Sequence, residues 1–246
     1  PEKFTGDLRE PGAFSGALIG LAIVLLVDSA RGLPIYLSIC NLFILLIYLY
    51  HLSAVGYPQM PAVDTEFPAL PLVGDKKWHV EKFCREHRLH GVLVVFLRGS
   101  YCASSRHQLH QIRALVPDLA RRNIGLVLFS TQPGNKWPTS LITEFSEFGD
   151  ENLSVKGDAG HFEASAKSDN ERFQLGQLDI SGEGISLFVA QSSAPTILRP
   201  WVRDAARPSA WLIDAEGVIL WRELSTNYRV PASADLLRAQ LFRVDD

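Results

Sequence analysis

The residue placed most clearly for chemistry is Cys102, which follows a valine-rich run ending at Arg98 and precedes a stretch of helical periodicity. A thiol where a strand passes into a helix lies beside free backbone N–H groups and the positive end of the helix dipole, and both favour the nucleophilic thiolate. Arg98, Arg106 and His107 are placed to add positive potential, and Ser105 is placed to hydrogen-bond a thiolate. A small buried apolar cysteine is the alternative, but the position at this junction favours a reactive thiol.

The other cysteines and the histidines indicate no second site. The chain has three cysteines, Cys40, Cys84 and Cys102. An odd number without a CxxC pair does not make a disulfide framework. Two HxxH pairs are present, His87 with His90 and His107 with His110. Neither has a carboxylate or cysteine at ligand spacing, so we expect solvated histidines, no metal and no cofactor.

The elements around Cys102 predict a parallel βαβ unit. Residues 91–98 and 124–130 are short, continuous apolar runs, typical of buried strands. Apolar side chains between them recur at helical spacing, and Pro117 is expected to kink or end that helix. This order predicts two parallel strands joined by a helical crossover.

The C-terminal region predicts a β-hairpin and a final helix. Residues 209–213 and 218–224 flank a tight turn, and residues 232–242 form an amphipathic helix with Ser233 as its N-cap. Further helices are expected over three ranges, 77–87, 140–148 and 164–173. Residues 174–200 show no clear pattern.

Two segments resemble the thioredoxin superfamily, and within it the redoxin or AhpC/TSA-like peroxiredoxin group. Residues 91–105, GVLVVFLRGSYCASS, are similar to that group's strand, Arg-Gly turn and aromatic-Cys-x-x-Cys/Ser site. Residues 206–221, ARPSAWLIDAEGVILW, are similar to its second signature, in which a proline, often cis, precedes a strand and an Asp-x-x-Gly hairpin. The resemblance extends over residues 66–242, with a poorly matched stretch at 131–206.

This resemblance implies a thioredoxin-like α/β fold, with a central mixed sheet flanked by helices. It implies a catalytic site with four members, Cys102, Ser105, Arg98 and Pro208. Pro208 would be a cis-proline packed opposite the thiol.

The chain departs from the resembled pattern at three positions. Ser105 stands where a second CxxC cysteine would be, and disulfide exchange needs two thiols. Gly99 and Val95 replace the threonine and the proline of the peroxiredoxin motif Pro-x-x-x-Thr-x-x-Cys. Cys84 could resolve a sulfenic acid, but on the preceding helix it is expected to pack in the core.

Residues 1–57 predict a membrane anchor formed by a helical hairpin. Two strongly apolar segments, 13–30 and 35–55, are candidate transmembrane helices, and the turn between them contains Gly32 and Pro34. A signal peptide is the competing interpretation, but it predicts a cationic start and a cleavage site. A proline-rich linker is expected over 58–75 and the redoxin domain over 76–246.

The predicted hairpin carries a stripe of small residues. Gly12, Gly16 and Gly20 recur every four residues and allow another helix to approach closely. That helix is either the second one of the hairpin or part of another membrane protein. Asn41, inside the second segment, is expected to face a helix rather than lipid. The lysines and arginines flanking the hairpin favour cytoplasmic termini and a cytoplasmic redoxin domain.

Two functions are compatible with these features. The 246 residues carry a net charge of -3, which excludes a general nucleic-acid binder. One function is a membrane-anchored thiol oxidoreductase or peroxidase that uses Cys102 alone. The alternative is a catalytically degenerate redoxin domain serving as an accessory or structural subunit of a larger membrane protein complex. The expected partners are the lipid bilayer and a membrane protein docked on the glycine stripe.

Overall fold

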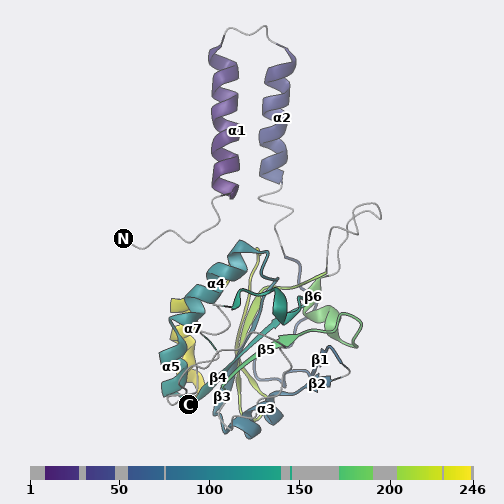
Figure 1. Ribbon diagram of the computed structural model, residues 1–246, viewed down its shortest axis with the longest axis vertical. Helices are drawn as coiled ribbons and strands as arrows, with labels where there is room; N and C mark the ends of the chain where they lie inside the picture. The colour runs from purple at the N-terminus through teal and green to yellow at the C-terminus, as the bar shows by residue number, and fades with distance from the viewer. Residues whose placement is uncertain are drawn as a thin grey trace. The chain divides into compact units, whose positions relative to one another are not determined.

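The computed structural model in Figure 1 describes residues 9–27, 32–47, 55–74, 76–139, 145, 172–190, 204–228 and 230–244. The chain divides into two compact units. The first consists of Pro1–Gly56 with Thr226–Arg229, and the second of Tyr57–Ser225 with Val230–Asp246.

A five-stranded mixed sheet forms the centre of the second unit. Its strands, in spatial order, are β5 (Phe173–Gln177), β4 (Ile124–Ser130), β3 (Gly91–Phe96), β8 (Ser209–Asp214) and β9 (Ile219–Leu224). Strands β3, β4 and β5 run parallel, whereas β8 is antiparallel to β3 and β9 is antiparallel to β8. A parallel pair from a βαβ unit joined in one sheet to an antiparallel hairpin is the thioredoxin-like arrangement, so the predicted fold class is confirmed for this unit.

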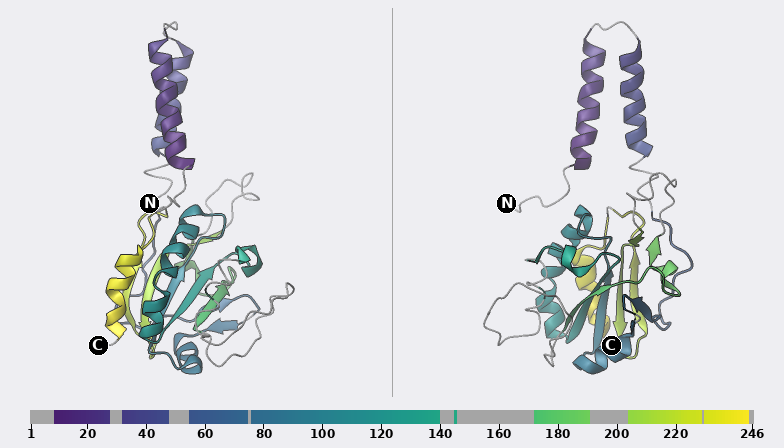
Figure 2. Two further views of the ribbon diagram at one scale, coloured as in Figure 1. Left: turned by 60° about the vertical axis from the view of Figure 1, so that its left-hand side comes forward. Right: turned by 45° about the vertical axis from the view of Figure 1, so that its right-hand side comes forward.

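Side chains alternate along the strands and form two apolar layers, one on each face of the sheet. On one face, Val94 and Phe96 pack in a cluster with Trp78, Phe83 and other buried side chains. On the other face, Leu93 and Val95 pack with side chains of the covering helices. Those helices are α4 (Ala103–Arg113), α5 (Val116–Arg121) and α7 (Ala234–Gln240), which lie together against one side of the sheet in Figure 2. The first face lies near α3 (Val80–His87), β1 (Leu70–Leu72) and β2 (Lys76–Trp78).

The proline-rich stretch contributes to the second unit instead of joining two separate parts. Met60, Phe67 and Leu70 are buried in the first apolar cluster, and Glu66 bridges Val218 at the start of β9. Backbone hydrogen bonds also join Asp64 and Thr65 to Ile219 at the start of β9. The unit boundary therefore falls after Gly56.

Most predicted boundaries in the second unit agree with the structure within a few residues. Pro117 does mark a helix boundary, because α4 ends at Arg113 and α5 begins at Val116 with the proline in its first turn. Ser233 is the predicted N-cap of α7, and its side chain accepts a hydrogen bond from the Leu236 N–H at 3.3 Å. The predicted helix at 77–87 is shorter, since residues 76–78 form β2.

The poorly matched stretch supplies the remaining elements. It contains the edge strand β5 and two short paired strands, β6 (Val189–Ala190) and β7 (Ala205–Ala206). Short 3₁₀ turns occur at Gly134–Lys136 and Ile185–Leu187, and another, Leu241–Val244, follows α7. The helices expected at 140–148 and 164–173 fall mostly outside the described residues, and Phe173 begins β5.

The first unit contains the two helices of a hairpin, α1 (Arg9–Leu26) and α2 (Leu33–Ile47), which contact each other. The partly buried side chains recur at helical spacing on both helices and mark the contact: Phe14, Ala17, Leu21 and Val24 on α1, and Ile35, Ser38, Leu42, Leu45 and Leu46 on α2. Within the described part of the chain, neither helix combines the length and apolar character needed to cross a membrane.

The glycine stripe does not form the contact between α1 and α2. Gly12 and Gly16 are exposed and Gly20 is partly buried, and a Cβ atom added at any of the three would meet no atom within 4 Å. Asn41 is also exposed, so the helix that it is expected to face is not α1 of the same hairpin. Bulkier side chains, led by Phe14 and Leu21, occupy the contact instead.

Candidate functional site

The segment that carries Cys102 leaves the sheet at the carboxyl end of β3. The Leu97 N–H still donates to the Phe129 carbonyl at 2.8 Å, so the chain departs from the sheet only after this residue. A turn follows, closed by the hydrogen bond from the Cys102 N–H to the Gly99 carbonyl at 3.1 Å. Gly99 has φ of +145°, a backbone conformation that glycine adopts without strain. The glycine of the Arg-Gly pair therefore permits this turn.

Cys102 is the N-cap residue of α4, with an extended backbone of φ −87° and ψ 117°. Its carbonyl accepts the first helical hydrogen bond, from the Arg106 N–H at 3.1 Å, and its side chain makes no capping hydrogen bond. The residue is only 9 % exposed. The residue is therefore nearly buried at the start of a helix, the place in the fold predicted from the sequence.

Ser105 has a different partner from the one predicted. In the described structure its Oγ accepts a hydrogen bond from the backbone N–H of Arg98 at 3.2 Å, and the residue is 5 % exposed. This hydrogen bond joins the first turn of α4 to the second residue after β3. Ser105 thus supports the geometry of the segment through the backbone of Arg98.

Pro208 lies at the same end of the sheet as the Cys102 turn, because the next residue, Ser209, pairs with Phe96. Its carbonyl accepts hydrogen bonds from the Tyr57 hydroxyl and the Ser225 N–H. No cis peptide bond occurs in the described residues, which include Arg207 and Pro208. The cis-proline implied by the resemblance is therefore wrong for this structure, and the peptide has the trans form that costs less free energy.

Gln132 belongs to this region and was missed by the sequence analysis. Its Oε1 accepts the Ser100 N–H at 2.8 Å, and its Nε2 donates to the Ser100 Oγ at 2.8 Å. A Cβ atom added to Gly99 would lie 2.5 Å from the same Oε1. One signal could have found it: Gln132 comes just after a buried strand parallel to β3, and functional groups gather at the carboxyl ends of such strands.

Cys84 lies at the other end of β3. It is 1 % exposed on α3, and burial, with smaller contributions from nearby carboxylates including that of Asp214, raises the pKa of the Cys84 thiol to about 12. Asp214 pairs with Gly91, the first residue of β3, whereas Cys102 follows its last residue. A strand of this length spans about 17 Å. Cys84 is therefore a core side chain, too remote to form a disulfide with Cys102.

In each histidine pair, one ring contacts another side chain of its own helix. The His107 ring shares a hydrogen bond of 3.0 Å with Gln111, and the His87 ring packs against Phe83 with 4.7 Å between centroids. Among the residues that the structure describes, no group of three or more His, Cys, Asp and Glu side chains could hold a metal ion.

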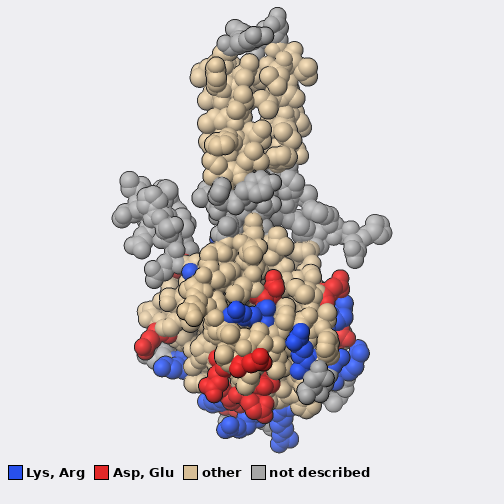
Figure 3. Space-filling view, turned by 180° about the vertical axis from the view of Figure 1, so that it is seen from behind, with Lys and Arg blue, Asp and Glu red and all other residues tan. Residues whose placement is uncertain are grey.

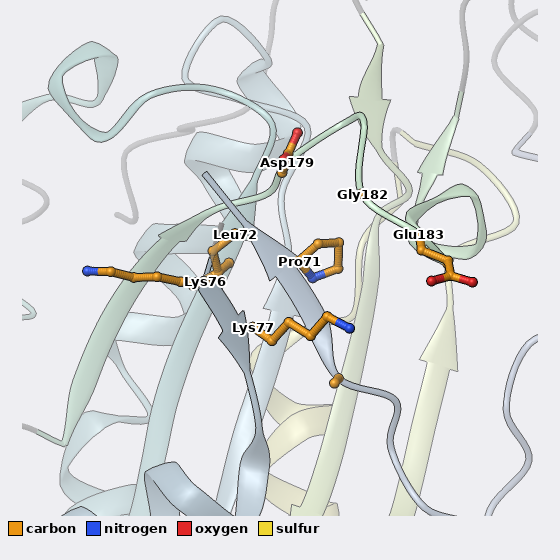
Figure 4. A pocket seen from close by; sticks show the side chains of 9 residues that line it. Pro71, Leu72, Lys76, Lys77, Asp179, Gly182 and Glu183 are labelled. Atoms are coloured by element: carbon orange, nitrogen blue, oxygen red, sulfur yellow. The ribbon is translucent and has the colours of Figure 1, made fainter. Parts of the chain in front are cut away.

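An open hollow of about 330 Å³ lies elsewhere, between the β1–β2 hairpin and the turn at 179–184. Figure 4 shows Lys76, Lys77, Asp179 and Glu183 around it. Hydrogen bonds from Ser181 hold the pKa of Asp179 below its ordinary value. None of the residues that line the hollow belongs to the Cys102 segment, so it is no access route to the thiol.

Comparison with known proteins finds similarity at the level of structure only. No protein-family model and no curated protein sequence matches the chain. The similar solved structures include peroxiredoxin 6 of Arenicola marina, with 10 % identity, a TM-score of 0.49, and coverage of 76 % of this chain and 73 % of that one. A thiol peroxidase from Chromobacterium violaceum has 14 % identity, a TM-score of 0.47, and coverage of 78 % and 92 %. Reduced Prx3 from Vibrio vulnificus in complex with H₂O₂ has 12 % identity, a TM-score of 0.47, and coverage of 73 % and 99 %. The fold assignment rests on the strand order and directions given above.

Proposed function

We propose that this chain is a membrane-anchored thiol peroxidase or oxidoreductase that works through a single cysteine, Cys102. The observation that carries the proposal is the position of this thiol, which lies nearly enclosed at the N-cap of α4 and beside the end of the central strand β3. Helix N–H groups at this position stabilise negative charge on sulfur, and the thiolate is the form that attacks.

The chemistry of the first step is oxidation of the thiolate by a hydroperoxide. The sulfur forms a bond to one peroxide oxygen as the O–O bond breaks, and the departing oxygen takes a proton and leaves as water or an alcohol. Cys102 becomes a sulfenic acid, which condenses with a second thiol to give a disulfide and water. Because Cys84 lies at the opposite end of β3 and Ser105 stands where a neighbouring cysteine would be, the unit that carries Cys102 does not supply the second thiol.

Peroxide consumption tests this function. The purified chain, with dithiothreitol as reductant, is expected to consume H₂O₂ in repeated turnovers. Cys102→Ser should reduce consumption to the rate of dithiothreitol alone, whereas Cys84→Ser should retain the activity. Equal consumption by wild type and Cys102→Ser would contradict the proposal.

The membrane part of the proposal rests on the outer surface of the hairpin. On the face that the space-filling view in Figure 3 displays, the described part of the two helices carries no Lys, Arg, Asp or Glu. Large apolar side chains are exposed on both, among them Ile19, Ile23 and Leu25 on α1 and Leu37, Phe43 and Ile44 on α2. An apolar surface of this extent favours burial, and the bilayer is the partner that fits exposed apolar side chains on both helices. We place the termini and the redoxin unit on the cytoplasmic side.

Flotation with phosphatidylcholine vesicles tests the anchor. The wild-type chain is expected to float with the vesicles after a carbonate wash, and Ile23→Asp with Ile44→Asp should leave most of the protein in the soluble fraction. A matched control, Ile23→Ala with Ile44→Ala, should still float. Equal partitioning of the aspartate and alanine variants would contradict insertion.

A second candidate function, that of an accessory subunit, is favoured by one observation. Gly12 and Gly16 face away from α2, so their smooth surface is free for a helix of another membrane protein. If such a partner docks there, Gly16→Leu should release the chain from its complex on a native gel in mild detergent, while Gly16→Ala should remain bound. If the wild type and both variants migrate as the same monomer, this candidate fails.

A further inference from the structure

We infer that Gln132 is a positioning residue, whose side-chain amide holds the turn that presents Cys102 at the start of α4. This inference rests on the proposed function of Cys102. It adds a residue from the loop after a second strand, β4, to a site otherwise built from the β3–α4 segment. Gln132 does not touch the sulfur and acts through Ser100.

The hydrogen bonds between Gln132 and Ser100 restrain the turn at its centre. The Ser100 N–H and Oγ are held by the two ends of one amide, each at 2.8 Å. A planar amide that donates with one end and accepts with the other fixes both the distance and the orientation of its partner. Ser100 lies inside the turn closed by Gly99 and Cys102, so its orientation sets where the cysteine enters the helix.

Gln132 is itself held by the sheet. Its backbone N–H donates to the Ser130 Oγ at 3.1 Å, and Ser130 is the last, fully buried residue of β4. The neighbouring Thr131 Oγ1 donates to the Asp204 carbonyl at 3.0 Å, which ties the same loop to the segment before β7. The amide therefore transmits the rigidity of the central sheet to the turn.

The turn lies close against one side of the Gln132 amide. A Cβ atom on Gly99 would lie 2.5 Å from Gln132 Oε1 and also 2.5 Å from the Tyr101 ring. With Ser105 fastened to the Arg98 N–H at 3.2 Å, both sides of the turn are restrained. Without the amide, the turn and the first N–H groups of α4 lose their fixed relation to the Cys102 sulfur.

Amide hydrogen exchange and the pH profile of Cys102 alkylation test this inference on the whole chain in a Cys40→Ser background. In Gln132→Ala, the Ser100 N–H is expected to exchange about fivefold faster, the factor that one hydrogen bond of typical net strength represents. Alkylation of Cys102 at pH 7 should slow about threefold to tenfold, and its pH profile should move toward higher pH. Ser100→Ala keeps the N–H bond and loses only the Oγ bond, so its effect should be smaller.

A matched control is Gln240→Ala, which removes a surface amide that accepts from Arg243 Nε at 2.7 Å on α7. It should change neither readout. The inference is overturned if Gln132→Ala leaves Ser100 exchange as in wild type, or raises exchange without altering the alkylation profile. If Gln132→Ala loses protection of the β3 amides as well, the variant is unfolded and Ser100→Ala decides by the same two readouts. A wild-type Cys102 that alkylates no faster than free cysteine would overturn the proposed function, while Ser100 exchange would still decide whether the amide restrains the turn.

Discussion

Strand β3 has a cysteine near each end, and the two thiols have opposite surroundings. Cys84, near the first residue, is enclosed by apolar side chains with carboxylates close by, and burial raises its pKa to about 12. Cys102, beyond the last residue, is also nearly buried but is the N-cap residue of helix α4. Burial is common to both, so the proposed difference in reactivity depends on the helix start that only Cys102 occupies.

The largest expected effect separates the two thiols by reactivity. In a Cys40→Ser background at pH 7.5, Cys102 should alkylate at least about a hundredfold faster than Cys84 in the folded chain, since each unit of raised pKa removes thiolate tenfold. Mass spectrometry of peptides after timed iodoacetamide labelling measures both rates. In urea the two rates should become similar, and a difference that persists there would show that the folded surroundings are not its cause.

The second effect is a loss of stability at alkaline pH, which we expect from ionisation of the Cys84 thiol. In the unfolded chain this thiol ionises near its ordinary pKa of about 8.5, whereas the folded chain keeps the proton up to about 12. Its stabilising contribution is therefore complete below the unfolded pKa and declines as pH rises toward the folded one. The free energy of unfolding should fall by at most about 1.4 kcal/mol per pH unit from this proton.

Urea unfolding at pH 8.0, 9.0 and 10.0 measures this slope. Cys84→Ala should have a lower stability at pH 8.0, because a buried side chain is truncated, but a flatter decline with pH than wild type. Parallel curves for wild type and Cys84→Ala would mean that the thiol ionises alike in both states.

The smallest effect concerns the hydrogen bond between Ser105 and the backbone of Arg98. Ser105→Ala leaves the Arg98 N–H without the acceptor found at 3.2 Å, which should cost about 1 kcal/mol and slow Cys102 alkylation a few fold. Ser104→Ala, one residue earlier on the same helix, is the matched control and should change neither quantity. Urea unfolding and alkylation kinetics would show whether the effect is confined to Ser105; equal behaviour of the two variants would remove Ser105 from the site.

The fold was predictable where a local sequence pattern specified the element. Parts of the site were not predictable, because they depend on contacts between distant segments. The continuous apolar runs at 91–98 and 124–130 identified β3 and β4, because strands buried on both faces are apolar throughout. The edge strand β5 alternates too little to be recognised, and its sequence includes Gly176 and two glutamines. Ser105 was identified as important, but its partner depends on where the backbone of Arg98 lies after the turn. Gln132 required knowledge of which loops meet in space.

The most direct test is to trap the sulfenic acid that the proposed function requires. The folded Cys40→Ser chain is treated with one equivalent of H₂O₂ in the presence of dimedone, and each cysteine is examined by peptide mass spectrometry. We predict a dimedone adduct on Cys102 and none on Cys84. An absence of adduct on Cys102, or equal labelling of the two cysteines, would contradict the assignment of Cys102 as the reactive thiol.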